Sequence, residues 1–326
     1  MKSKLIIICI LSLCLIIGLT ACSAVQVNER IFVSLMGIEE DNGLCELSVQ
    51  AYSSTESGKD SPVPKYKTYS GKGRSFYEAA DMIKRESGRE LFFGHCGAVF
   101  LDDDFIRSKD KLRMLAGERI SAGCPVILSE EPADEVERED DDDNLIGSEV
   151  IISSVRRYAD EGLYSEVTLR DVTAAADSGG IIIVPLSDEH ISGAAAVDMS
   201  GKTVYLDLSE TAAVNLLRGE QGIQMSIFGG SLSVNVSDMT VYFRQDNNRG
   251  EYSVKLVAEG ILDEPGDSDN LDEYRHEAER IISGSTEAIL EKAERNGFLS
   301  AVLPKDYAYS EGYENVDFTV ETILEI

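Results

Sequence analysis

The chain has 326 residues, of which 43% are hydrophobic and 27% are charged, and its formal net charge is −29. This length accommodates about two or three domains, and the composition is that of a globular protein rather than a disordered one. Because 59 acidic residues stand against 30 basic ones, nucleic acid and anionic lipid head groups are poor partners for the molecule as a whole.

The N-terminus has the pattern of a secretory signal. Lys2 and Lys4 precede an apolar run over 5–19, which is shorter than the ~20 residues that a membrane-spanning helix needs. Leu19-Thr20-Ala21-Cys22 then resembles the bacterial lipobox, in which the chain is cut before a cysteine that carries a diacylglycerol. We therefore expect residues 1–21 to be a lipoprotein signal peptide and Cys22 to be the lipidated first residue of the mature protein. The alternative is a plain signal or an uncleaved anchor in which the cysteine is incidental. Without residues 1–21, 28 basic and 59 acidic residues remain, and the formal charge becomes −31.

The first half of the mature chain alternates strand and helix signals. Two β-rich runs flank Asp41-Asn42-Gly43, residues that tolerate positive φ angles, and so predict a hairpin over 31–53. Ser75 is a suitable N-cap, and Gly88 is placed to end the helix that follows it. The remaining elements expected here are a buried strand over 90–104, a helix over 105–116, a strand over 125–130, helices within 145–163 and 165–180, and a strand over 181–187 that ends at Pro185.

The last third has a different pattern, with longer runs of alternating apolar and polar residues. We interpret these alternating runs as antiparallel strands. The expected elements are a strand, turn and strand over 192–209, a short helix over 209–222 opened by Ser209, strands over 230–245 and 251–262, a regular helix over 271–294, and a final strand over 316–326. Both periods coexist, so we predict an α+β fold, a mixed multi-domain lipoprotein with antiparallel sheets and packed helices.

Composition changes along the chain suggest six segments. We expect a signal peptide at 1–21, a lipid-proximal tether at 22–30, an N-terminal α/β domain at 31–134, an acidic linker at 135–145, a middle region at 146–189, and a C-terminal α+β domain at 190–326. Whether the middle region packs with the N-terminal domain is left open. The acidic run at 135–144 lacks the spaced ligands and the glycine of an EF-hand loop, which favours a solvated linker over a calcium site.

The sequence contains no assembled catalytic motif. Its three histidines are His95, His190 and His276, and no Gly-x-Ser-x-Gly elbow accompanies them. Gly94-His95-Cys96 lacks further spaced metal ligands, so we interpret His95 as a core residue, whereas His276 lies in a charged helix and should be solvated. "SGKT" at 200–203 imitates a phosphate-binding loop, but Ala196 stands where that loop needs glycine, and a hairpin turn is expected here. Paired carboxylates for glycoside hydrolysis stay open, and we expect neither a metal nor a cofactor.

Three cysteines, Cys45, Cys96 and Cys124, remain besides the proposed anchor, and none is in a C-x-x-C spacing. Three thiols permit one disulfide at most. We expect buried free thiols and no essential disulfide.

One stretch goes beyond generic patterns, "GKGRSFYEAADMIKRESGRELFFGH" at 71–95. Together with the lipobox and "IFVSLMGIEEDNGLCELSVQ" at 31–50, it resembles the C subunit of the spore nutrient germinant receptors, the Ger(x)C lipoprotein family. "SEVTLRDV" at 165–172 and the segment 191–219 also resemble family segments. The residues that match the family pattern in 71–95 are Gly73, Glu78, Ala79, Gly88, Arg89, Leu91, Phe92, Gly94 and His95.

The resemblance implies a lipid-anchored, non-enzymatic C-type subunit that works with A-type and B-type receptor subunits in germination signalling. It implies a location on the outer face of the cytoplasmic membrane, which in the spore is the inner membrane. It supplies no catalytic residues, and the matching residues of 71–95 have either a structural role or a partner contact. The alternatives are a solute-binding lipoprotein of a transporter and, ranked last, a secreted hydrolase.

Overall fold

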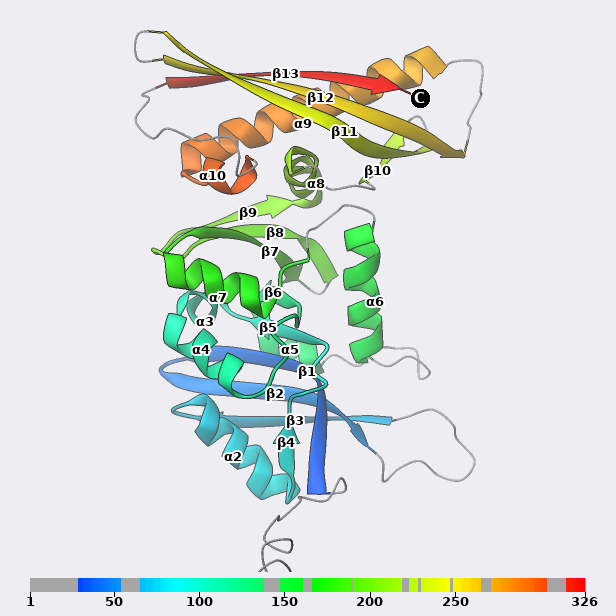
Figure 1. The fold of residues 1–326 in the computed structure, drawn as a ribbon. Helices are drawn as coiled ribbons and strands as arrows, with labels where there is room; N and C mark the ends of the chain where they lie inside the picture. The colour runs from blue at the N-terminus through cyan, green and yellow to red at the C-terminus, as the bar shows by residue number, and fades with distance from the viewer. Residues whose placement is uncertain are drawn as a thin grey trace, which may run out of the picture.

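The computed structural model describes residues 29–53, 65–137, 147–160, 166–188, 190–218, 223–227, 230–246, 249–264, 271–303 and 315–325. These residues form two β-sheets that follow one another along the long axis of the molecule, with helices around and between them (Figure 1). The predicted α+β class is confirmed. Cys22 and the expected signal peptide lie outside the described residues.

The centre of the first sheet consists of four parallel strands. They are β1 (Arg30–Asp41), β5 (Ala98–Leu101), β6 (Val126–Ser129) and β7 (Ile181–Asp188), paired in that order. Every residue of β5 and β6 is buried. This burial on both faces is typical of parallel strands, which are covered by helices on either side.

Antiparallel strands extend the first sheet on both sides of this centre. Beyond β1 lie β2 (Leu44–Ser53) and β3 (Lys65–Gly73), and beyond β7 lie β8 (His190–Asp198) and β9 (Thr203–Asp207). A short strand, β4 (Glu90–Phe92), pairs in parallel with the beginning of β1. Because β7 and β8 are paired, strands from both sides of the expected boundary at 189 belong to one sheet.

Helices cover both faces of the first sheet. On one face the buried core receives side chains from α2 (Phe76–Ser87), α3 (Asp103–Arg107), α4 (Lys109–Gly117) and α7 (Leu169–Ser178). On the other face, Val136 of α5 (Pro132–Glu137) and Val155 of α6 (Gly147–Asp160) pack on Leu35, Phe100 and Ile127. The first three residues of the expected acidic linker are therefore helical, and 138–145 lie outside the described residues.

The second sheet has the strand order β10 (Ile223–Ile227), β11 (Gly230–Asp246), β12 (Arg249–Glu264) and β13 (Asn315–Glu325). The long helix α9 (Leu271–Asn296) lies along one of its faces (Figure 1). Between the two sheets lie α8 (Leu208–Leu217) and α10 (Leu299–Val302). The core around these helices joins the sheets, because it contains side chains of the second sheet together with Ile183, Ala194, Ala196 and Leu206 of β7, β8 and β9.

Two local predictions are confirmed in detail. The hairpin of β1 and β2 turns at Asn42 and Gly43, whose φ angles are 52° and 77°. Helix α2 begins after Ser75, whose Oγ accepts the Glu78 N–H at 3.3 Å, and ends at Gly88 with φ 68°. Each feature depends on neighbouring residues alone, which explains why the sequence revealed it.

Three boundaries in the first half of the chain were predicted wrongly. The expected strand over 90–104 is two strands, because a turn at Gly94 and His95 separates β4 from β5, and both then pair with β1. The helix expected over 105–116 is split into α3 and α4 at Ser108. Strand β7 continues through Pro185, which it tolerates because β6 pairs only with Leu186 and Ser187.

Two predictions in the last third were also wrong. Helix α8 starts after Asp207 rather than at Ser209, because Asp207 and Glu210 form a reciprocal capping box. The last strand, β13, pairs with β12 in parallel and not antiparallel. The connection between them runs through α9, and a crossover of this kind is what parallel neighbours require.

Candidate functional site

The residues that match the family pattern in 71–95 lie in one continuous unit made of β3, α2 and β4. A Cβ at Gly73 would lie only 2.5 Å from the Cβ of Glu78, so glycine allows the strand to approach the helix closely. Glu78 Oε2 accepts the N–H of Arg74 at 2.9 Å, and Ala79 is fully buried against the sheet. Gly88 ends the helix. These four residues therefore hold the unit in shape.

The second half of the motif surrounds a group of rings. The Phe92 ring packs edge-on against Phe32, with centroids 5.5 Å apart, and against His95 at 5.7 Å. The guanidinium of Arg30 lies 5.3 Å from the Phe92 centroid, a cation–π distance. A Cβ at Gly94 would lie 2.7 Å from the Phe92 ring, so glycine lets the ring rest on the turn. We call Arg30, Phe32, Phe92 and His95 the aromatic cluster.

The surroundings of His95 correct one expectation. His95 is exposed, not a core residue, and Arg30, Phe32 and Phe92 are half-buried. Leu91 points to the opposite face, where it packs on the core beside α2, while Arg89 is half-buried and donates its N–H to Ser87 Oγ at 3.2 Å. By contrast, His276 is exposed as predicted and contacts Glu279 at 3.2 Å.

A second feature, which the sequence did not predict, is a cleft of about 700 Å³ at the carboxyl ends of β6 and β7. A neighbouring hollow of about 260 Å³ shares four lining residues with it, Ser129, Glu130, Leu186 and Tyr205, and continues to the end of β5. We call the two together the acidic cleft. Its acidic lining residues are Glu130, Glu131, Asp134, Glu135, Glu137 and Asp188 in the larger part, and Asp102, Asp103 and Asp104 in the smaller.

Polar contacts hold some of these carboxylates in place. Glu135 is only 5% exposed, and its Oε1 accepts the Ser187 hydroxyl at 2.8 Å. Glu137 Oε1 accepts a hydrogen bond from the hydroxyl of Ser70. So many carboxylates in one cleft attract cations and repel anions. Among the described residues, no group of three or more His, Cys, Asp or Glu side chains is placed to hold a metal ion.

Asp102 stands at the border of the acidic cleft and has an altered pKa. Burial, together with the neighbouring Asp103 and Asp104, raises its pKa to about 6, although hydrogen bonds from backbone N–H groups oppose this rise. Its Oδ1 caps α3 by accepting the Phe105 N–H at 2.5 Å, and its Oδ2 accepts the Glu40 N–H at 2.6 Å. The charge at this end of the cleft therefore changes near neutral pH.

The three remaining cysteines are buried free thiols, as expected. Burial raises the pKa of Cys45 to about 11, and the neighbouring Cys124 together with burial raises the pKa of Cys96 well above its usual range. Both groups stay protonated at neutral pH, so they are poor nucleophiles and poor metal ligands.

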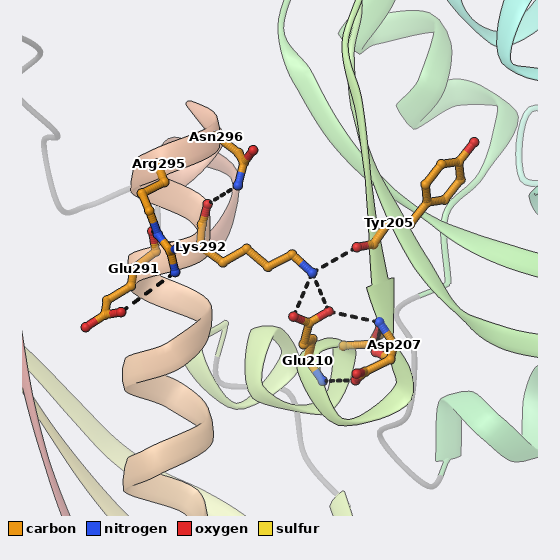
Figure 2. A network of polar contacts seen from close by, with 8 residues as sticks. Tyr205, Asp207, Glu210, Glu291, Lys292, Arg295 and Asn296 are labelled. Atoms are coloured by element: carbon orange, nitrogen blue, oxygen red, sulfur yellow. Dashed lines mark hydrogen bonds and ion pairs between the residues drawn. The ribbon is translucent and has the colours of Figure 1, made fainter.

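A polar network joins α9 to β9 and α8, as Figure 2 shows. Lys292 of α9 donates to the backbone carbonyl of Tyr205 at 3.0 Å and to both carboxylate oxygens of Glu210 at 2.6 Å. The ring of Tyr205 points away from Lys292, and Tyr205 also lines the acidic cleft. The "SGKT" segment is a hairpin turn between β8 and β9, and its Lys202 donates to Asn296 of α9 at 2.9 Å.

The sequence did contain a signal for the acidic cleft. Acidic residues stand directly after or at the end of β5, β6 and β7, at 102–104, 130–131 and 188. Carboxyl ends of parallel strands share one edge of a sheet, where ligand crevices commonly form. The prediction required knowing that these three strands are parallel neighbours, and the chain pattern did not reveal that.

Comparison with known proteins identifies the family. The fold is that of an α+β protein whose described helices include none that is long and apolar enough to cross a membrane. A family model described as the spore germination protein N-terminal domain matches residues 23–188. Since this is more than half of the chain, the protein belongs to that family, the germinant receptor C subunits that its sequence resembles.

One solved structure supports the fold. The crystal structure of the GerBC protein matches with a TM-score of 0.51 and 13% identity, covering 89% of this chain and 96% of that chain. At this identity the likeness concerns the fold alone. Among curated protein sequences, none matches this chain.

Proposed function

We propose that this protein is the lipid-anchored, non-enzymatic C-type subunit of a spore nutrient germinant receptor complex. The observation that carries the proposal is the match of the spore germination family model over residues 23–188. A role in spore germination and a membrane-associated location are what this family membership supports. The lipid anchor at Cys22 and the position on the outer face of the membrane are finer proposals, supported by the lipobox-like Leu19-Thr20-Ala21-Cys22.

The contacts of the described residues support a non-enzymatic role. His95 is engaged with aromatic rings, His276 with Glu279, and the buried thiols Cys45 and Cys96 are held protonated. Glu135, the most deeply buried carboxylate of the acidic cleft, is held by Ser187. A catalytic acid–base pair needs groups free to exchange protons with a substrate, and Glu135 and the two buried thiols are instead held in structural surroundings.

The test of this function is purification of the full-length protein from detergent-solubilised spore membranes. We expect A-type and B-type receptor subunits, one of them multi-spanning, to purify with it. Recovery of ATP-driven permease components would instead favour a solute-binding lipoprotein, a reading to which the acidic cleft at parallel strand ends lends some support. A protein that purifies alone and hydrolyses peptidoglycan or ester substrates would overturn both.

The anchor has its own test. Cys22→Ala should leave a folded protein that is no longer retained by the membrane. The two acyl chains of a diacylglycerol give stable anchoring, and the variant has no acyl chain. Spores that carry the variant should respond weakly to nutrient germinants. Mass spectrometry of the wild-type N-terminus should find the diacylglycerol on Cys22, and an unmodified cysteine there would contradict the anchor.

A further inference from the structure

The aromatic cluster lies at the amino ends of β1 and β4, on the face of the sheet opposite α2 and outside the buried cores. The parallel register pairs Arg30 with Glu90 and Phe32 with Phe92, so these side chains share one face, while Ile31 and Leu91 point into the core on the other. Within the described residues, none of the four side chains of the cluster belongs to a buried core. The rings are packed on one another and half open to solvent.

The cluster is also close in sequence to the proposed anchor. Seven residues lie between Cys22 and Arg30, where β1 begins, so the two Cα atoms are eight residue steps apart. A fully extended chain of eight residues spans at most about 28 Å. If Cys22 carries lipid, as the proposed function states, this end of the first sheet stays within that distance of the bilayer.

Charge favours the same orientation. The amino ends of β1 and β4 carry the aromatic cluster, whereas the acidic cleft lies at the carboxyl ends of β5, β6 and β7. Parallel strands share one direction, so the two features lie at opposite edges of the first sheet. Near the cluster, Glu90 is paired with Lys84 at 2.8 Å, and Glu29 is exposed. Phosphate groups of a membrane would repel the acidic edge more strongly than the edge that carries Arg30.

We propose that the aromatic cluster is the surface with which the anchored protein rests in the interfacial layer of the bilayer. Aromatic rings and arginine side chains suit this layer, because an apolar body meets the acyl boundary while polar groups stay among the head groups. Phe32 and Phe92 enter the interface, Arg30 contacts phosphate groups, and His95 lies at the rim. The cluster thereby fixes which end of the molecule faces the membrane and leaves the acidic cleft facing away from it.

The absence of tryptophan from the chain permits a direct test. Phe92→Trp places a single indole in the cluster, and Tyr242→Trp places one on β11 of the second sheet, where Tyr242 is 61% exposed. Each variant of the chain from Ser23 onward carries an N-terminal hexahistidine tag and is tethered to phosphatidylcholine vesicles that contain a nickel-chelating lipid. This tether replaces the natural lipid, so the result does not depend on modification of Cys22.

We expect the indole at position 92 to shift its emission to shorter wavelength on tethering and to be quenched by brominated phosphatidylcholine. The indole at position 242 should keep its emission in solution and stay unquenched. Adding Arg30→Glu to Phe92→Trp should reduce the quenching, while circular dichroism checks that both variants stay folded. Unchanged emission and no quenching at position 92 would overturn the proposal.

A protein partner is the competing occupant, and a second arm separates it. The same variants are produced as full-length protein in spore membranes, with and without the other receptor subunits. Shielding of position 92 that appears only when those subunits are present, and not on vesicles, would assign the cluster to a protein interface and refute the membrane contact. If Cys22 proves unmodified but the indole at position 92 of the tethered protein is still quenched, the lipid anchor is refuted and the membrane-facing surface is supported.

Discussion

The two sheets of this protein bury their residues in different ways. The first sheet has parallel central strands with helices on both faces, and β5 and β6 are buried at every residue. The second sheet has α9 along one face, and its strands alternate, so that on β12 Tyr252, Val254 and Leu256 are buried while Glu251 and Ser253 are exposed. A strand that is covered on both faces appears in the sequence as a continuous apolar run. A strand that is covered on one face appears as alternating apolar and polar residues.

The two candidate surfaces lie on only one of the two sheets. The acidic cleft and the aromatic cluster both belong to the first sheet, at its opposite edges. From α9, which packs on the second sheet, Lys292 donates to the carbonyl of Tyr205 in the first sheet (Figure 2), and Asn296 accepts from Lys202. Four experiments test whether the two sheets differ in this way, beginning with the largest expected effect.

Removal of the last strand should have the largest effect. Truncation after Gly312 deletes β13, and with it the buried side chains of Phe318, Thr322 and Leu324. Each large apolar side chain contributes about 1.5 to 3 kcal/mol when buried, so the second sheet should lose its cooperative unfolding. Thermal unfolding with limited proteolysis measures this, and the first sheet should survive as a protected fragment. A truncated protein that melts like the intact one would show that β13 contributes little.

Truncation of one aromatic side chain in each sheet compares the two directly. Phe100 of β5 is 1% exposed and lies between the sheet and α6, so Phe100→Ala should cost about 3 to 5 kcal/mol of unfolding free energy. Tyr242 of β11 is 61% exposed, and Tyr242→Ala should change stability by less than about 0.5 kcal/mol. Urea denaturation of both variants measures the two losses of unfolding free energy. Equal losses would mean that the outer face of the second sheet is covered in solution.

The contact between the sheets should have a smaller effect. Lys292 and Glu210 are each 28% exposed in their side chains and are paired at 2.6 Å. A double-mutant cycle with Lys292→Met and Glu210→Gln should give a coupling energy of about 0.5 to 1 kcal/mol. Glutamine is chosen because it preserves the capping contact with Asp207. A coupling energy indistinguishable from zero would mean that the buried apolar core, and not this ion pair, joins the two sheets.

The fourth experiment concerns a pH dependence that arises from Asp102. Its folded pKa of about 6 lies above the usual value, so between about pH 4 and pH 6 the folded protein holds a proton that the unfolded chain has released. The stabilisation is complete below the unfolded pKa and is lost as pH rises through 6. In Asp102→Asn, stability should no longer decrease as the pH rises through 6. Denaturation midpoints of wild type and variant, measured from pH 4 to pH 7, test this. Parallel pH profiles for wild type and variant would mean that Asp102 is ionised throughout.

Much of the local structure follows from short-range chemistry, and the sequence alone determined it. Asn42 and Gly43 made the first hairpin predictable, because a tight turn needs residues that accept positive φ. Ser75 and Gly88 did the same for α2. The family pattern over 71–95 was likewise visible in the sequence, and the family is confirmed by the match over 23–188.

Only the tertiary structure decided which strands are neighbours and what gathers at their ends. β13 and β12 are parallel because α9 carries the chain back across the sheet, whereas alternation alone suggested antiparallel pairing. His95 is exposed because the turn before β5 sets it beside Phe32 and Phe92, although a run of apolar neighbours suggested burial. The carboxylates of 102–104, 130–131 and 188 form one cleft because three parallel strands end at one edge. Such pairings join residues far apart in the chain, and their energy comes from contacts that no local pattern records.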